Sequence, residues 1–287
     1  MPLKQIRWTI VIMLIALACP AGIPAADQTD YFGSLQKRLI RDRFSAKRIS
    51  TLYQHPSVNF DTRGVSLYFI HQESKLNYDQ FLEPGPIQRA KTYMLDHQSA
   101  LIQAEKTFGV HRYVITAILL VETRLGTYVG NRLVLNTFSS MAALADPAVR
   151  RAVWNEVAGT THLTKAKFNA KADQKARWAY DELKAFLTYT RAENIDPHTV
   201  VGSYAGAMGY CQFLPSNALK LARDGNGDGR IDLFNHPDAI MSVAGYLNRY
   251  GWHSGITREK AYKSVYHYNH SKYYVNTVLR IVDALKG

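Results

Sequence analysis

The stretch RYVITAILLVETRLG, residues 112–126, decides the fold of this chain. Its spacing predicts a helix from about His111 to Arg124 that Gly126 stops. The helix is apolar almost all round until its last turn, and such a helix is buried. We therefore expect it at the centre of a mainly α-helical protein.

Glu122 is the unusual residue in this helix. A carboxylate near the C-terminal end of a helix faces the negative end of the helix dipole, so helix energetics do not explain it. Arg124 lies two positions away and points elsewhere. Glu122 either reaches solvent or a distant arginine, or it has apolar neighbours that raise its pKa. The second alternative would keep it protonated, as a general acid must be.

Helical spacing continues on both sides of this stretch. Residues 30–53 are predicted to form one or two short helices, and the run from Val65 to Phe69 is typical of a strand. A helix is expected from Ile87 to about Phe108. Beyond the central helix, we expect a short helix around Trp154 and a polar helix from about Asp173 to Arg191.

The N-terminus is predicted to be a signal peptide, residues 1–26. Lys4 and Arg7 precede an apolar run that is shorter than the roughly 20 residues needed to span a bilayer. A retained membrane anchor is the weaker alternative. Cys19 follows a poor lipoprotein processing sequence, so cleavage after Ala25 or Ala26 is favoured. Export is expected, with peripheral or lipid-anchored membrane contact left open. The mature chain would keep Cys211 alone and form no internal disulfide.

The formal net charge of +12 falls to about +10 once the two basic residues of the signal are removed. Such a charge favours a polyanionic environment. Lysines and arginines are scattered, and no zinc-finger or RNP-like pattern is present, so nucleic acid is not expected as a partner. An acidic bacterial envelope fits better, and an ordinary solvated surface remains the alternative.

A glycine-rich stretch, GSYAGAMGYCQFLPS, occupies residues 202–216. Its glycines permit close approach of a backbone or a ligand. Ser203, Tyr210 and Gln212 carry hydroxyl, aromatic and amide groups of the kind that bind sugars. Taken alone, such a stretch is more typical of tight helix packing.

The segment DGNGDGRIDLFNHPD, residues 224–238, has the first half of an EF-hand calcium loop. Position 12 holds Asn235 in place of the usual glutamate. We therefore expect Asp238, at position 15, to supply the missing carboxylate. The alternative is a turn without metal. The expected Ca²⁺ ligands are Asp224, Asn226, Asp228, Asp238 and the backbone carbonyl of Arg230.

Four ordered segments together resemble the soluble and membrane-bound lytic transglycosylases of the B type. They are FGVHRYVITAILLVETRLGTYVGN, GSYAGAMGYCQFLPS, DGNGDGRIDLFNHPDAIMSVAGYLNRYGW and YNHSKYYVNTVL. The resemblance implies a lysozyme-like catalytic core over residues 87–287, with an inserted helical lobe at about 139–200 and an EF-hand-like calcium loop. Residues 27–86 match weakly and are expected to pack on the core.

The resemblance also implies roles for individual residues. Glu122 becomes the catalytic acid and base, Ser203, Gln212 and Tyr246 lie in the glycan groove, and Tyr268 and Asn269 complete the pocket around the scissile bond. It supports the calcium loop as well. Leu125 and Cys211 depart from the residues common in the family.

The activity implied is cleavage of the bond between N-acetylmuramic acid and N-acetylglucosamine in peptidoglycan, without water, leaving 1,6-anhydro ends. A hydrolytic glycosidase generally needs two carboxylates, whereas here the sugar's own 6-hydroxyl attacks and one suffices. A muramidase on the same fold and a non-catalytic wall-binding protein remain alternatives. A periplasmic monomer without an organic cofactor is expected.

Overall fold

Helix α6 (Arg112–Thr123) is the buried central helix that its sequence predicts. Its side chains from Val114 to Leu120 are all inaccessible to solvent. Arg124 and Leu125 then adopt left-handed backbone conformations, with φ of 51° and 64°. Their N–H groups donate to the carbonyls of Leu120 and Leu119 at 3.0 and 2.9 Å. This left-handed turn ends the helix.

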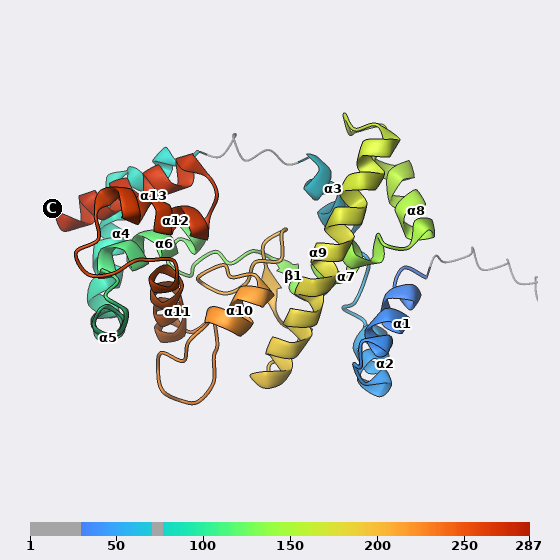
Figure 1. Ribbon diagram of the computed structural model, residues 1–287, viewed down its shortest axis with the longest axis horizontal. Helices are drawn as coiled ribbons and strands as arrows, with labels where there is room; N and C mark the ends of the chain where they lie inside the picture. The colour runs from blue at the N-terminus through green and yellow to red at the C-terminus, as the bar shows by residue number, and fades with distance from the viewer. Residues whose placement is uncertain (1–29, 71–76) are drawn as a thin grey trace, which may run out of the picture. The chain divides into compact units, whose positions relative to one another are not determined.

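The computed structural model describes residues 30–70 and 77–287, so the predicted signal peptide and Cys19 lie outside the described residues. The described part is mainly helical (Figure 1). The other elements before α6 are α1 (Gly33–Arg41), α2 (Ala46–Gln54), α3 (Thr62–Ile70), the 3₁₀ helix η2 (Asp79–Leu82), α4 (Pro84–Asp96) and α5 (Gln98–Phe108).

The elements after α6 are β1 (Arg132–Leu133), α7 (Val134–Ala143), α8 (Pro147–Val157), α9 (Lys165–Ala192), β2 (Val201–Gly202), α10 (Pro215–Leu221), α11 (His236–Arg249), α12 (Arg258–Tyr268) and α13 (Lys272–Lys286). Strands β1 and β2 pair antiparallel, with Arg132 opposite Gly202. Among the described helices, none is long and apolar enough to cross a membrane.

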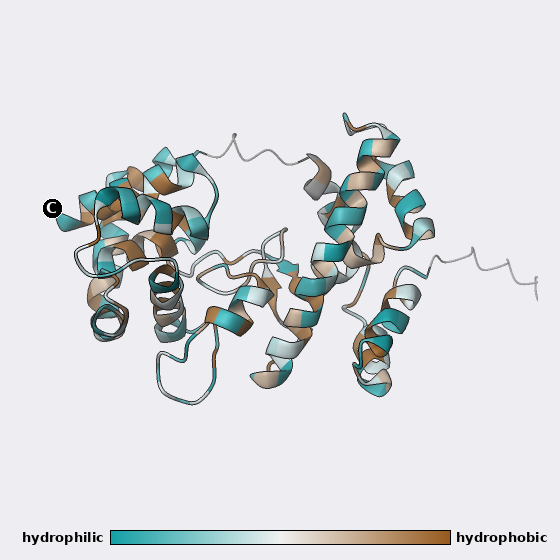
Figure 2. Cartoon of the chain, viewed as in Figure 1, coloured by the Kyte–Doolittle hydropathy of each residue, from teal (hydrophilic) through white to brown (hydrophobic). Residues whose placement is uncertain are grey.

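Packing joins elements that are distant in the sequence. Helix α13 packs against α6, α11 against α5, and α7 against the long helix α9 (Figure 1). In Figure 2, α13 carries apolar residues in brown beside polar residues in teal. Its buried side chains, from Tyr274 to Leu285, follow helical spacing. The apolar face of α13 therefore covers one side of the central helix.

Three details of the sequence prediction were wrong. The strand expected from Val65 to Phe69 lies in α3, because these two residues are four apart and both are buried on one face of the helix. The helix expected over 87–108 is two helices, since His97 leaves helical geometry at φ −111°. The polar helix begins at Lys165, eight residues earlier than expected.

Residues 53–61 attach the N-terminal part of the described chain to helix α7. The Tyr53 hydroxyl lies 2.8 Å from Ser139 Oγ, and the Asp61 N–H donates to Ser140 Oγ at 2.8 Å. The Asp61 carboxylate forms an ion pair with Arg132 of β1. These contacts join the N-terminal helices of the described chain to α7 and β1.

Candidate active site

A cleft of about 850 Å³ opens beside the C-terminal end of α6. Its walls come from residues that are widely separated in the chain, and aromatic and amide side chains are common among them. The lining residues are Asn77, Tyr78, Gln80, Phe81, Val121, Glu122, Tyr128, Val129, Gly130, Asn131, Arg132, Gly202, Ser203, Tyr204, Ala207, Gln212, Tyr268, Asn269 and Tyr274.

Glu122 projects into this cleft from the last turn of α6 and is partly buried. The hydroxyl of Tyr274, on α13, donates a hydrogen bond to Glu122 Oε1 at 2.7 Å. Burial raises the pKa of the Glu122 carboxyl to about 7, although the hydrogen bond from Tyr274 lowers it. At neutral pH a substantial fraction of Glu122 therefore carries a proton that it can donate.

The helix end that presents Glu122 is fixed by its neighbours. Thr123 Oγ1 donates to the carbonyl of Tyr210 at 2.9 Å and accepts the N–H of Gly126 at 2.9 Å. Gly126 has φ 89°, and a Cβ there would lie 3.0 Å from the His236 ring and 3.1 Å from the Tyr210 ring. Glycine suits this position because any other residue would be strained by the positive φ and its Cβ would press on both rings.

The glycine-rich segment forms tight turns that bring Ser203 and Gln212 to the cleft wall. Ser203 Oγ accepts the N–H groups of Ala205 and Ala207 at 3.3 and 3.2 Å. Gln212 has φ 50°, and its amide donates to the carbonyls of Val129 and Gly209 at 3.3 and 3.0 Å. These hydrogen bonds hold both polar side chains in the wall of the cleft that also contains Glu122.

Tyr268 and Asn269 line the cleft where α12 ends. The Tyr268 hydroxyl donates to the carbonyl of Cys211 at 2.5 Å, which ties α12 to the glycine-rich segment. The structure therefore brings five of the predicted site residues together: Glu122, Ser203, Gln212, Tyr268 and Asn269.

Tyr210 and Tyr246 lie outside the cleft lining. The Tyr210 ring stacks on His236 with centroids 4.4 Å apart. Tyr246 is 5% exposed, its ring lies 4.8 Å from that of Tyr268, and its hydroxyl donates to the His267 carbonyl. Tyr246 packs behind Tyr268, which lines the cleft, and Tyr210 packs next to the turn that ends α6.

Sequence reasoning missed several residues of the cleft. Tyr274 belongs to the C-terminal segment YNHSKYYVNTVL, but its sequence position does not reveal the contact with Glu122. Tyr78 and Phe81 come from the weakly matching N-terminal region. Tyr128, which is 66% exposed, could have been noticed as an aromatic residue soon after the predicted helix end.

The acids around the cleft decide which chemistry it supports. Among the described residues that line it, Glu122 is the only Asp or Glu. The nearby Asp61 is occupied by its ion pair with Arg132. The described lining thus supplies one proton donor and no second carboxylate to activate water or act as a nucleophile.

In the predicted calcium loop, backbone N–H groups donate hydrogen bonds to acidic side chains and fix their positions. Asp224 accepts the N–H groups of Gly227 and Gly229 at 2.6 and 2.8 Å, and buried Asp238 accepts those of Gly225 and Asp232 at 2.9 and 2.7 Å. Within the described residues, no group of three or more His, Cys, Asp or Glu converges as a metal site.

Comparison with known proteins agrees with this geometry. The family model described as a transglycosylase SLT domain matches residues 27–259. The chain belongs to the B-type lytic transglycosylase family. It is 32% identical over 176 residues to membrane-bound lytic murein transglycosylase B of Escherichia coli, a match that covers 61% of this chain and 41% of that protein. The chain therefore spans about two fifths of the length of this relative.

Two solved structures of the family share the fold. The soluble lytic transglycosylase SltB1 of Pseudomonas aeruginosa has a TM-score of 0.72 at 22% identity, covering 88% of this chain and 97% of SltB1. Escherichia coli Slt35 in complex with calcium has a TM-score of 0.71 at 21% identity, covering 90% of this chain and 93% of Slt35. The expected lysozyme-like helical fold is confirmed by these matches.

Proposed function

We propose that this protein is a peptidoglycan lytic transglycosylase that cleaves the β-1,4 bond between N-acetylmuramic acid and N-acetylglucosamine without consuming water. One observation carries the proposal: Glu122, with a pKa raised to about 7, is the only acid among the described residues that line the cleft. A single carboxyl of this kind suits a reaction whose nucleophile belongs to the substrate.

In the proposed mechanism, Glu122 donates its proton to the glycosidic oxygen as the C1–O4 bond breaks, and N-acetylglucosamine departs with a free 4-hydroxyl. Positive charge develops at C1 of the muramic acid. Glu122, now a carboxylate, then takes the proton of the muramic acid's 6-hydroxyl while that oxygen bonds to C1. The product is a 1,6-anhydro sugar, and Glu122 ends the cycle protonated. The hydrogen bond from Tyr274 stabilises the transient carboxylate.

The cleft walls would hold the glycan on either side of Glu122. Ser203, Gln212, Tyr268 and Asn269 line the cleft and offer hydroxyl, amide and aromatic contacts to the sugars. We assign Tyr246 and Tyr210 indirect roles, since Tyr246 packs against Tyr268 and Tyr210 packs at the helix end. A relative supports the product: Pseudomonas aeruginosa SltB3, with a TM-score of 0.68 at 18% identity, was solved in complex with NAG-anhNAM-pentapeptide.

Product analysis tests this function. Purified peptidoglycan is incubated with the protein, and the released fragments are examined by mass spectrometry before and after borohydride reduction. We expect ends that lack one water and resist reduction. Reducible muramic acid ends as the main product would identify a muramidase instead.

Glu122→Gln separates catalysis from binding. The variant keeps the shape of the side chain but cannot donate the proton, so we expect it to bind peptidoglycan and release no fragments. Undiminished lysis would show that the acid is elsewhere. Binding without lysis by both wild type and variant would indicate a non-catalytic wall-binding protein.

We also propose that residues 224–238 bind Ca²⁺, which would stabilise the loop. The fit rests on its oxygen groups: among the described residues, neither Asp224, Asp228 nor Asp238 pairs with a lysine or arginine. Asn235 Oδ1, at position 12, is buried and has no hydrogen-bond partner in the described chain. Asn226 and the Arg230 carbonyl complete the proposed set.

Chelation tests the calcium proposal directly. Bound Ca²⁺ stabilises only the folded state, so EDTA should lower the melting temperature and excess Ca²⁺ should restore it. Asp224→Asn should weaken the restoration. A melting temperature that responds to neither reagent would show that the segment is a turn without metal.

The proposed substrate sets the expected compartment. We propose that residues 1–26 direct export to the periplasm, with the mature protein acting as a monomer, and that residues 27–86 pack on a catalytic core carrying a helical insertion at about 139–200. The ion pairs of Asp61 with Arg132 and of Asp79 with Arg280 support that packing, because both arginines lie outside the proposed insertion. Cell fractionation with mass spectrometry of the mature N-terminus would test the export and the cleavage site.

A further inference from the structure

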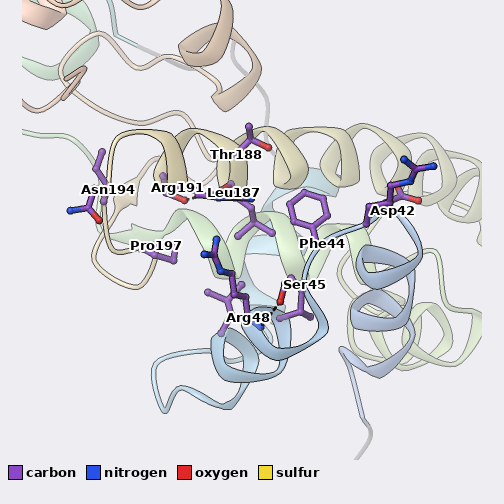
Figure 3. Close-up of a pocket in the computed structure, with 14 residues that line it drawn as sticks. Asp42, Phe44, Ser45, Arg48, Leu187, Thr188, Arg191, Asn194 and Pro197 are labelled. Atoms are coloured by element: carbon purple, nitrogen blue, oxygen red, sulfur yellow. Dashed lines mark hydrogen bonds between the residues drawn. The ribbon is translucent and has the colours of Figure 1, made fainter. Parts of the chain in front are cut away.

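A second cavity, of about 690 Å³, lies where the turn between α1 and α2 faces the C-terminal end of α9 (Figure 3). We call it the arginine pocket, because Arg43, Arg48 and Arg191 are among the residues that line it. It shares no lining residue with the cleft around Glu122.

The arginine pocket has an apolar base and a basic rim. Ile49 and Leu52 are buried at its base, whereas the three arginines are exposed. In Figure 3 the Arg48 side chain extends from α2 toward the segment that carries Pro197. A cavity of this kind suits a ligand that has an aliphatic part and an acidic end.

The charge of the rim is not compensated within the described chain. Arg43, Arg48 and Arg191 form no ion pair with any described carboxylate. Asp42, the one acid in the lining, accepts a hydrogen bond from Tyr180 at 3.0 Å and lies 3.5 Å from Lys184 Nζ. The guanidinium groups thus remain available for an acidic ligand, which they bind through paired hydrogen bonds.

We propose that the arginine pocket binds the carboxylate groups of stem peptides on the peptidoglycan strand, as an accessory site separate from the cleft. This inference rests on the proposed function, which makes peptidoglycan the polymer at hand. The sugar rings themselves are uncharged, whereas the stem peptides combine carboxylates with short aliphatic side chains. The peptides therefore match both parts of the pocket.

The two cavities are close enough to share one polymer. Pro197 lines the arginine pocket, and Gly202 lines the cleft five residues later. An extended chain spans at most about 3.6 Å per residue, so these two walls lie within roughly 18 Å of each other. A stem peptide on glycan bound in the cleft would therefore have to span a distance of this order to reach the arginine pocket.

The test uses Glu122→Gln as the background, so that strands bind without being cut. Binding is measured by co-sedimentation with intact sacculi and with peptide-free glycan, which is prepared by removing the stem peptides with an amidase and converting the freed lactyl carboxylates to amides. Arg48→Glu with Arg191→Glu should weaken binding to intact sacculi at least tenfold and leave binding to peptide-free glycan unchanged. The double variant Arg48→Gln with Arg191→Gln should lose less binding to intact sacculi, because it removes the positive charges without adding negative ones. It replaces the glutamate variant in the test if the glutamate variant does not fold.

The double variant Lys106→Glu with Lys220→Glu is the matched control. Neither lysine lines either cavity, and the net charge falls by the same amount as in Arg48→Glu with Arg191→Glu. This pair should bind both substrates as the background does. An equal loss with the control, an equal loss on peptide-free glycan, or no loss at all overturns the proposal. Binding to phosphatidylglycerol vesicles is measured as well. If the arginine variants lose vesicle binding but keep binding to intact sacculi, the proposal is overturned, and the pocket would instead bind the phosphate of lipid headgroups. The product spectrum on peptide-free glycan tests the proposed function separately.

Discussion

Tyr274→Phe removes one hydrogen bond from the proposed acid and little else. The Tyr274 hydroxyl lies 2.7 Å from Glu122 Oε1, and the tyrosine ring is 1% exposed, so phenylalanine keeps the packing of α13 against α6. The bond favours the charged form of Glu122. Its loss should therefore raise the pKa of Glu122 further above its ordinary value.

The size of this shift follows from the strength of the bond. A hydrogen bond to a charged group contributes about 1.5–3 kcal/mol, and one pKa unit corresponds to about 1.36 kcal/mol. The pKa of Glu122, already raised to about 7, should rise by roughly one to two further units. Because Glu122 becomes negative during bond cleavage, the rate at low pH should also fall, by roughly tenfold.

The assay is the initial rate of release of soluble fragments from peptidoglycan, measured from pH 5 to pH 10. Glu122 must start protonated, so the rate falls as pH rises through its pKa. In Tyr274→Phe this fall should occur one to two pH units higher than in wild type. Tyr189→Phe is the matched control, because its buried hydroxyl donates to the Ile231 carbonyl at 2.8 Å, in a contact that does not involve Glu122.

An unmoved or lowered pH profile in Tyr274→Phe would refute the reasoning, since it would mean that this bond does not set the protonation of the group that limits the rate. The same shift in Tyr189→Phe would refute it as well, because the effect would then come from a general loss of stability.

Two further predictions concern stability. Burial of Glu122 raises its pKa from an ordinary 4.5 to about 7, so wild type loses stability as pH rises through this range. Glu122→Gln should therefore be more stable than wild type at pH 8 by up to about 3 kcal/mol, with the difference vanishing below about pH 4.5, as measured by urea unfolding. Equal stability at both pH values would contradict this. Gly126→Ala should lose about 1–3 kcal/mol in the same assay, because of its φ of 89° and its contacts with His236 and Tyr210; unchanged stability would contradict the strain.

The parts of the structure that could be predicted are those determined by the spacing of apolar residues within a short stretch of sequence. The apolar run in α6 specifies a buried helix, and an unexplained carboxylate within it identified Glu122 as a candidate before any contact was known. The end of α6 was predicted from Gly126, which lies just beyond the last apolar turn, whereas the left-handed conformations of Arg124 and Leu125 were not predicted.

The remaining parts depend on contacts that sequence spacing does not encode. Val65 and Phe69 have the β-branched and aromatic character of a strand, yet packing places them on one face of α3. His97 interrupts a pattern that is helical on both sides. The contribution of Tyr78 and Phe81 to the cleft depends on where the chain before α4 runs in space.

The hydrogen bond between Tyr274 and Glu122 joins residues 152 positions apart. During synthesis, the ribosome delivers Glu122 long before Tyr274, and the cleft lacks one wall until α13 has packed against α6. An unfinished polypeptide therefore contains Glu122 but lacks the Tyr274 hydroxyl, whose hydrogen bond lowers the pKa of Glu122. Under the proposed function, full activity therefore requires that α13 has packed against α6.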